Sequence, residues 1–141
     1  MKRFFTIVLV IALLCSVSIT GYAADTEKSF EKPPSYGTRM TYINQVYTSL
    51  YISSNGLSNS YSYIYAYPGV DSVRISMYLQ RYNDGWETVK HWAQDFDGTY
   101  GQLSKDWYVY SGYEYRVLTY FYAYEGSATE SVSLIHDDVW Y

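Results

Sequence analysis

The sequence predicts an all-β domain, and three observations support that prediction. From Met40 to Ile135, polar and apolar residues alternate with a period of two, the period of a half-buried strand, and helical periodicity is almost absent. Residues that favour turns interrupt the alternation at intervals of roughly 8–12 residues. Twenty of the 141 residues are tyrosine, which favours strands, and several recur at every second position.

About seven strands account for this pattern. We expect them at residues 44–53, 58–67, 71–82, 86–94, 106–110, 114–124 and 129–135, with a loop at 95–103. The turns between them include Asn55–Gly56, Pro68–Gly69 and the run from Asn83 to Gly85, where glycine allows a positive φ. The third strand alternates most regularly, and its expected core face consists of Val73, Ile75, Met77 and Leu79.

Short strands with regular turn signals are typical of an immunoglobulin-like antiparallel β-sandwich. A tyrosine that enters the penultimate strand strengthens this prediction. Tyr115, within the run Gly112–Val117, is placed to hydrogen-bond back across a corner of the sandwich. An open barrel has the same periodicity, so the sequence leaves both architectures open.

The N-terminal residues 1–23 have the pattern of a cleavable secretory signal peptide, expected to form a helix. Met1–Arg3 is basic, Phe4–Ile19 is almost continuously apolar, and Gly21 and Ala23 form the small pair that precedes an expected cleavage after Ala23. The apolar segment is too short to span a membrane stably. An uncleaved anchor or a core helix is the alternative. We therefore expect a secreted protein, extracellular or associated with the cell surface.

Cleavage would change the charge and the cysteine content of the chain. The remaining 118 residues carry eight basic and 14 acidic residues, a formal net charge of −6, which repels phosphate backbones and anionic lipids. Nucleic acid and membranes are therefore poor candidates as partners. Cys15 is the only cysteine, so the mature chain has no thiol, disulfide or lipid anchor, as in many exported bacterial proteins. Residues 24–39, with Pro33 and Pro34, predict a flexible linker before the domain at 40–135, and 136–141 a C-terminal tail.

Three segments of the chain resemble a known family. They are Val73–Arg81, the hairpin that leads to Trp86–Trp92, and Gly112–Val117. The chain resembles a family of small secreted immunoglobulin-like domains of unknown function from Gram-positive anaerobes, over about Met40 to Ile135. The resemblance implies a fold and no activity, because these segments are features of the fold. The chain is richer in tyrosine than the family pattern, so a role of the rings can be its own.

Two tryptophans are the first candidates for a binding surface. Trp86 and Trp92 lie six residues apart in one expected strand, which places them on one face. Aromatic rings offer a large, stiff contact area, so the pair could stack against sugar rings. The alternative is that one or both cover the core or the sheet edge. Trp107 faces the same side as Val109 and is expected in the core.

The tyrosine rows pose the same choice between recognition and structure. For the row from Tyr61 to Tyr67 the face is open: inward tyrosines would leave Ser60, Ser62, Ile64 and Ala66 in water, and outward tyrosines would leave an unusually small core face. For Tyr120, Tyr122 and Tyr124 the outward face is expected, because Phe121 belongs to the core. Outward rings serve either recognition or cross-strand pairing, which is stabilising by itself.

The sequence offers little support for metal binding or catalysis. Asp95 and Asp97, with Asp106 downstream, invite a calcium interpretation, but the remaining EF-hand spacing is absent and solvated loop acids are the simpler one. His91 and His136 lie far apart without a pattern of zinc ligands. No nucleophile elbow or phosphate-binding glycine loop is present. We expect no metal, no cofactor and no catalytic residue, and thus no enzyme.

The composition and the rows together favour a non-catalytic binding module. Its ligand is expected to be a glycan, peptidoglycan included, or else another extracellular protein. The residues expected to bind it are Tyr120, Tyr122, Tyr124, Trp86 and Trp92. A structural or self-associating cell-envelope protein is the alternative, and a small secreted toxin is a third possibility. The sequence sets no oligomeric state.

Overall fold

A computed structural model describes residues 40–141. The expected signal peptide at 1–23 and linker at 24–39 lie outside the described residues. The regular structure within residues 40–141 consists of strands, and none of them forms a helix that is long and apolar enough to cross a membrane. The strands are β1 (Ile43–Ile52), β2 (Leu57–Ala66), β3 (Ser72–Tyr82), β4 (Trp86–Asp97), β5 (Tyr100–Tyr108), β6 (Glu114–Glu125), β7 (Ala128–Ile135) and β8 (Val139–Trp140).

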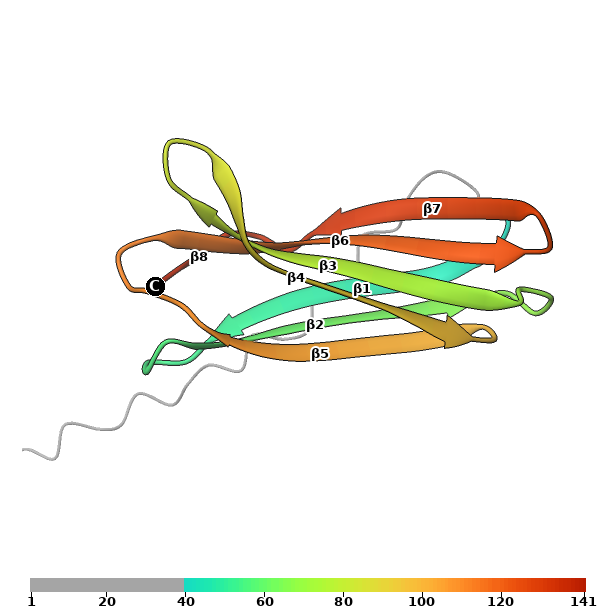
Figure 1. Ribbon diagram of the computed structural model, residues 1–141, viewed down its shortest axis with the longest axis horizontal. Coiled ribbons are helices and arrows are strands. Elements are labelled where there is room, and N and C mark those ends of the chain that lie inside the picture. Colours follow the sequence, from blue (N-terminus) through green and yellow to red (C-terminus); the bar gives the residue numbers. More distant parts are fainter. Residues whose placement is uncertain (1–39) are drawn as a thin grey trace, which may run out of the picture. The chain divides into compact units, whose positions relative to one another are not determined.

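The strands form two antiparallel sheets that lie face to face (Figure 1). One sheet has the order β1-β2-β5. The other has the order β4-β3-β6-β7, with the short β8 beside β6. The chain crosses between sheets from β2 to β3 and again from β4 to β5, so β5 returns beside β2 and β6 beside β3. The two sheets confirm the predicted sandwich over the open barrel.

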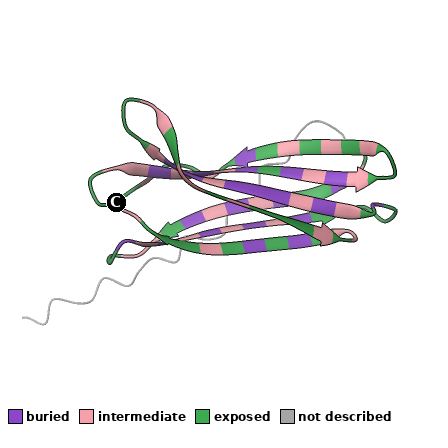
Figure 2. Ribbon diagram, in the orientation of Figure 1, coloured by how far each residue is buried: buried purple, intermediate pink, exposed green. Residues whose placement is uncertain are grey.

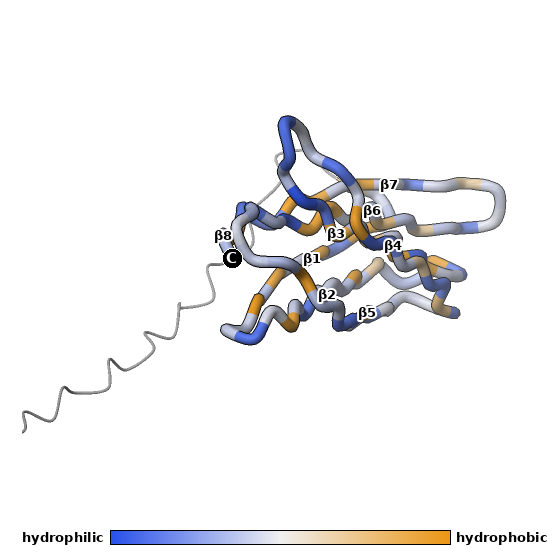
Figure 3. The backbone as a smooth tube through the Cα atoms, turned by 60° about the vertical axis from the view of Figure 1, so that its left-hand side comes forward, coloured by the Kyte–Doolittle hydropathy of each residue, from blue (hydrophilic) through white to orange (hydrophobic). Residues whose placement is uncertain are grey.

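The core lies between the two sheets, as the period-two pattern predicts. Buried and exposed residues alternate along the strands in Figure 2, and hydrophobic and hydrophilic positions alternate along the backbone in Figure 3. Burial of apolar side chains is the main stabilising contribution, at about 25 cal/mol per Å² removed from water. The innermost side chains include Ile43, Ile64, Val73, Ile75, Met77, Leu79, Val117 and Phe121.

Three of the five inward positions of β2 are serines, followed by Ile64 and Ala66. Ser58, Ser60 and Ser62 are 0% exposed, so the tyrosines that alternate with them point to solvent. The structure thus settles the face that the sequence leaves open, in favour of outward rings. The inward serines are accommodated because bulky residues of the opposite sheet, such as Met77 and Phe121, fill the space between the layers.

Two of these serines differ in their hydrogen bonding. The Ser62 hydroxyl lies 2.9 Å from Thr48 Oγ1 and 3.0 Å from Thr119 Oγ1, and the two threonine oxygens lie 3.0 Å apart. These three hydroxyls, from both sheets, form a closed buried triangle in which each group can donate once and accept once, and Ser62 Oγ also lies 3.3 Å from Met77 Sδ, a weaker acceptor. Ser60 Oγ lies two residues away on the same face of β2 and has no hydrogen-bond partner among residues 40–141.

The predicted tyrosine corner is confirmed. Tyr115 is 1% exposed, and its hydroxyl donates a hydrogen bond of 2.8 Å to the backbone carbonyl of Tyr110. The ring therefore contributes to the core while its polar end fixes the connection that leads into β6.

The loop predicted at 95–103 is wrong. β4 continues to Asp97, the chain turns at Gly98 with a φ of +81°, and β5 already begins at Tyr100. The second glycine of the supposed loop, Gly101, lies within β5. A Cβ there would lie 2.5 Å from a ring carbon of Phe96, so the glycine makes room for the ring and does not mark a loop.

The C-terminal residues extend the larger sheet. The sequence predicts a tail at 136–141, but Val139 pairs with Tyr115 and Trp140 with Glu114 to form β8. The signal is weak in the sequence, because two residues are too few to show a period.

A carboxylate of β7 holds the start of β1. The Glu130 carboxylate accepts three backbone N–H bonds of 2.7–2.8 Å from residues 41–43.

Candidate functional site

The outer face of the β1-β2-β5 sheet is the strongest candidate site in the described part of the chain. Strand register places seven tyrosines on it, and four of them are among the most exposed large side chains of the domain. We call this surface the tyrosine face; its tyrosines are Tyr47, Tyr51, Tyr61, Tyr63, Tyr65, Tyr100 and Tyr108. The other positions are small or uncharged, apart from Asp106 at one end.

Five of the rings form one continuous cluster. Tyr47 and Tyr63 lie opposite each other on β1 and β2 and stack at a centroid distance of 5.3 Å and an interplanar angle of 21°. Tyr65 contacts Tyr63 edge-on at 5.5 Å and Tyr100 of β5 at 4.6 Å. Tyr61 lies 6.2 Å from Tyr63. Such pairs contribute about 0.5–1.5 kcal/mol each, so the rings hold one another in place before any ligand arrives.

Amide side chains border the cluster and orient the phenol hydroxyls. Gln45 Nε2 donates a hydrogen bond of 2.9 Å to the hydroxyl of Tyr63. The hydroxyl of Tyr100 donates one of 2.6 Å to Gln102 Oε1. Each amide has both donor and acceptor atoms, so the surface combines apolar ring area with hydrogen-bonding groups of both kinds.

The electrostatics keep these phenols neutral. Burial raises the pKa of the Tyr61 and Tyr63 hydroxyls above the ordinary tyrosine value, and neighbouring phenols, Tyr65 and Tyr47 among them, raise it further. A second phenolate beside the first would add like-charge repulsion. The raised pKa values thus favour the neutral form of the Tyr61 and Tyr63 hydroxyls.

The predicted row Tyr120, Tyr122 and Tyr124 lies on the opposite side of the sandwich. All three point outward from β6, as predicted, because the intervening Phe121 fills the core. Tyr122 and Tyr124 have nearly parallel rings at 6.4 Å, and Tyr120 meets Tyr78 of β3 edge-on at 5.9 Å.

Trp86 shares this outer face, and two neighbouring side chains contact its ring. The Arg116 guanidinium lies 4.0 Å from the centre of its ring, and Tyr82 meets it edge-on at 5.4 Å. A cation over the ring face is itself a stabilising contact. The position of Trp86 at one end of the strands, covered by these neighbours, gives it a structural role.

The prediction that Trp86 and Trp92 share a face is wrong. Leu79 pairs with Lys90 and Gln80 with Thr88, so Val89 is an extra residue in β4 and forms a β-bulge. One extra residue inverts the alternation on either side of it. Trp92 therefore lies opposite Met77 and packs against the core.

Trp107 is also placed differently from its prediction. It points to the inner side of β5 but is 41% exposed, because it lies at the open edge between the two sheets. Lys90 Nζ of β4 lies 4.1 Å from its ring centre, so this pair closes the edge rather than filling the core.

The acidic and histidine residues singled out in the sequence do not converge. Asp95 forms an ion pair of 3.0 Å with Arg74 on the larger sheet, and Asp106 lies on the outer face of the other sheet. Within residues 40–141 no three His, Cys, Asp or Glu side chains are grouped to hold a metal ion. His91 Nε2 contacts Ser76 Oγ at 2.9 Å, but Ser76 is buried and its hydroxyl is not presented to a substrate.

Comparison with known proteins assigns the chain to no family. No family model matches it, and no curated protein matches it. Among solved structures, it is similar to a crystal structure assigned as a β-galactosidase from Bacteroides fragilis, with 12% sequence identity and a TM-score of 0.42. The match covers 64% of this chain and 15% of that protein, so the chain spans a small fraction of its length.

Sequence reasoning missed the central part of the tyrosine face. Tyr47 and Tyr100 belong to no row in the sequence, and only strand pairing brings them beside Tyr63 and Tyr65. One signal was available in the sequence: the small residues that alternate with the tyrosines of β2. Small residues fit an inner face when larger side chains of the opposite sheet fill the core.

Proposed function

We propose that this domain is a secreted, non-catalytic module that binds a neutral glycan through the tyrosine face. The observation that supports the proposal is the continuous cluster of five phenol rings, bordered by amides, on an almost uncharged sheet face. A contiguous aromatic surface of this kind is unusual on a soluble domain without a partner.

The chemistry of the face fits a sugar better than the alternatives. The C–H faces of a pyranose ring are apolar and pack on an aromatic ring, and the hydroxyls at its rim need donors and acceptors such as Gln45 and Gln102 provide. A flat sheet with no basic residue on this face offers nothing to an anionic ligand. We therefore propose a neutral polysaccharide over a phosphorylated or sulfated one.

The composition of the face also resembles a known mode of recognition. Tyrosine, serine and asparagine dominate antibody binding sites, because tyrosine has large contact area and few rotatable bonds, and the small polar residues adapt their hydrogen bonds. Ser49, Asn59 and Ser104 lie among the tyrosines here. The predicted signal peptide supports the proposal, since a secreted protein meets polysaccharides outside the cell.

Native gel electrophoresis in the presence of soluble polysaccharides tests the proposal. Hydroxyethyl cellulose, galactomannan and glycogen are suitable neutral probes, and a pull-down with insoluble peptidoglycan, whose peptides carry carboxylates, is the charged comparison. We expect retardation by at least one neutral polysaccharide and weaker capture by peptidoglycan. Truncation of the central ring in Tyr63→Ser is expected to lower affinity by about tenfold or more, which corresponds to about 1.4 kcal/mol.

The matched control is Tyr82→Ser. Tyr82 is an exposed tyrosine on β3 of the other sheet, whereas Tyr63 is half-buried, so Tyr82→Ser removes a phenol ring without changing the tyrosine face. Retardation that is equal in both variants would contradict a role of the tyrosine face. Self-association through the same face is the competing function, and sedimentation velocity across a hundredfold concentration range distinguishes them: a face that binds glycan leaves the chain monomeric without sugar.

A further inference from the structure

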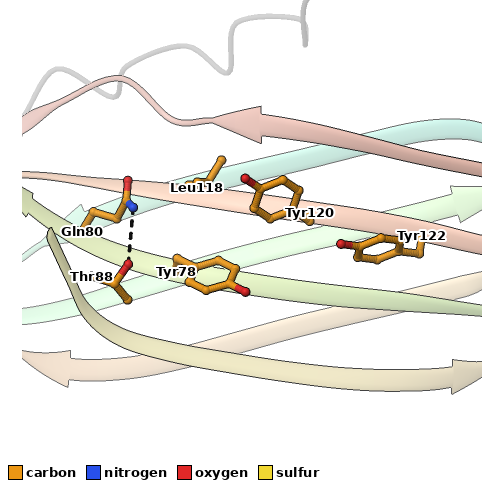
Figure 4. A pocket seen from close by; sticks show the side chains of 6 residues that line it. All are labelled: Tyr78, Gln80, Thr88, Leu118, Tyr120 and Tyr122. Carbon is orange, nitrogen blue, oxygen red and sulfur yellow. Dashed lines mark hydrogen bonds between the residues drawn. The ribbon is translucent and has the colours of Figure 1, made fainter. Parts of the chain in front are cut away.

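The opposite side of the sandwich carries a second surface of similar chemistry. A shallow, open hollow of about 440 Å³ lies on the outer face of the larger sheet, where β3, β4 and β6 run side by side (Figure 4). Its lining consists of Tyr78, Gln80, Thr88, Leu118, Tyr120 and Tyr122. Three of these six side chains are phenols, and the lining contains no Asp, Glu, Lys or Arg.

The polar groups of the hollow are held in fixed orientations. Gln80 Oε1 accepts a hydrogen bond of 2.9 Å from Arg116 Nε. This bond orients the amide oxygen toward Arg116 and the amide nitrogen toward Thr88. Gln80 Nε2 then lies 3.4 Å from Thr88 Oγ1, the contact drawn in Figure 4. A bond at this length is weak, so a ligand hydroxyl that inserts between the two groups loses little by displacing it.

The rings around the hollow are supported from the side. Tyr78 stacks on His91 of β4 at 4.3 Å and meets Tyr120 edge-on at 5.9 Å. In Figure 4 the rings of Tyr78, Tyr120 and Tyr122 surround the same space, with Gln80 and Thr88 at its other end. Aromatic area plus a few placed donors and acceptors, with the Arg116 guanidinium engaged by Gln80 and the Trp86 ring rather than lining the hollow, is again suited to a neutral sugar.

The two surfaces point in opposite directions because they are the outer faces of two packed sheets. A rigid polysaccharide surface that covers one face cannot reach the other. At one edge of the sandwich, the Lys90–Trp107 contact and the packing of Phe96 on Gly101 close the gap between the sheets. Occupation of both surfaces therefore requires two chains or two segments of a flexible chain.

We propose that the hollow is a second site for neutral oligosaccharide and that one domain bridges two polysaccharide chains. This inference rests on the proposed function, and it adds a cross-linking activity to it. Two weak sites on opposite faces cannot act together on one flat surface, but they hold neighbouring chains of a network together.

The test counts sites and measures cross-linking separately. The wild-type chain is titrated with cellohexaose, mannohexaose or maltohexaose, according to which polysaccharide it binds, and the turbidity of that soluble polysaccharide is followed. We expect two sites per monomer and turbidity that grows with protein concentration. Tyr120→Ser is expected to lose the hollow, keep the tyrosine face and abolish turbidity. Tyr63→Ser is expected to weaken the tyrosine face, keep the hollow and abolish turbidity as well. The double variant is expected to bind at neither site.

Two controls keep the outcome interpretable. Tyr120→Phe retains the ring and is expected to retain two sites and turbidity, and urea midpoints report whether each variant is folded. A wild-type stoichiometry of one per monomer, or turbidity that survives Tyr120→Ser, would overturn the second site while leaving the tyrosine face intact. Absence of binding by the wild-type chain to every probe would overturn the proposed function and this inference together.

Discussion

Two of the three inward serines of β2, Ser60 and Ser62, provide a matched pair of substitutions with opposite expected effects. Ser60 and Ser62 are both 0% exposed, lie on the same strand and the same face, and lose the same hydroxyl when changed to alanine. They differ in hydrogen bonding: Ser62 belongs to the triangle with Thr48 and Thr119, and Ser60 Oγ has no partner within residues 40–141.

The magnitudes follow from the groups left behind. Ser62→Ala removes two of the three bonds of the triangle, so one threonine hydroxyl keeps an unpaired donor and the other an unpaired acceptor in the core. A buried polar group without a partner costs about 1–3 kcal/mol, and we expect a loss of that size in the free energy of unfolding. Ser60→Ala removes a hydroxyl that is already unpaired, so it is expected to be neutral or to stabilise the fold by about 1 kcal/mol.

Urea unfolding, followed by tryptophan fluorescence, measures both variants. With a slope of about 1–3 kcal/mol per molar urea for a small domain, Ser62→Ala lowers the midpoint by about 1 M and Ser60→Ala leaves it unchanged or raises it. Equal losses in the two variants would refute the reasoning, because burial and volume are matched and only the hydrogen bonds differ. A double variant tests additivity between these neighbouring sites.

Four further substitutions, of which Gly98→Ala is a control for Gly101→Ala, test other parts of the fold by the same assay. Tyr115→Phe removes the corner hydrogen bond and is expected to cost about 1 kcal/mol; an unchanged midpoint would contradict a stabilising corner. Gly101→Ala places a Cβ against Phe96 and should cost about 1–3 kcal/mol, whereas Gly98→Ala, with nothing within 4 Å of its Cβ, tests backbone strain alone. Burial raises the pKa of the Glu130 carboxyl, but three backbone N–H bonds outweigh it and hold the pKa below the ordinary value. Its stabilisation is thus complete above the unfolded pKa and disappears as pH falls through the folded one; Glu130→Gln should cost about 1–2 kcal/mol at neutral pH and flatten that acid dependence.

Much of the fold could be predicted from the sequence because one face of most strands is apolar. The third strand shows this directly: Val73 and Ile75 alternate with polar residues, and the core face of β3 follows from that. The tyrosine corner was also accessible, since Tyr115 lies at a defined place relative to its strand. In both cases local sequence and global packing agree.

The errors have identifiable physical causes. The bulge at Val89 adds one residue without any turn signal, and it moves Trp92 to the face opposite Trp86. Gly101 resembles a loop residue in the sequence, but the ring of Phe96 from another strand explains it. Both effects depend on how two neighbouring strands meet, which the period-two pattern of a single strand does not show.

The candidate site was predictable only in part for the same reason. A row along one strand, such as Tyr120 to Tyr124, is visible in the sequence, and its outward face was correct. A cluster that crosses strands is not visible, because Tyr47, Tyr63 and Tyr100 become neighbours only through the pairing of β1, β2 and β5. The tyrosine face, the strongest candidate site, therefore becomes visible only when the register of β1, β2 and β5 is known.

The central claim is that the tyrosine face binds a neutral glycan. Calorimetric titration of the wild-type chain, Tyr63→Ser and Tyr82→Ser with the matching neutral hexasaccharide tests it most directly. For Tyr82→Ser the account predicts the same number of sites and the same affinity as for the wild-type chain. For Tyr63→Ser it predicts an affinity reduced about tenfold or more at one of the sites. Indistinguishable isotherms for all three folded proteins would contradict it.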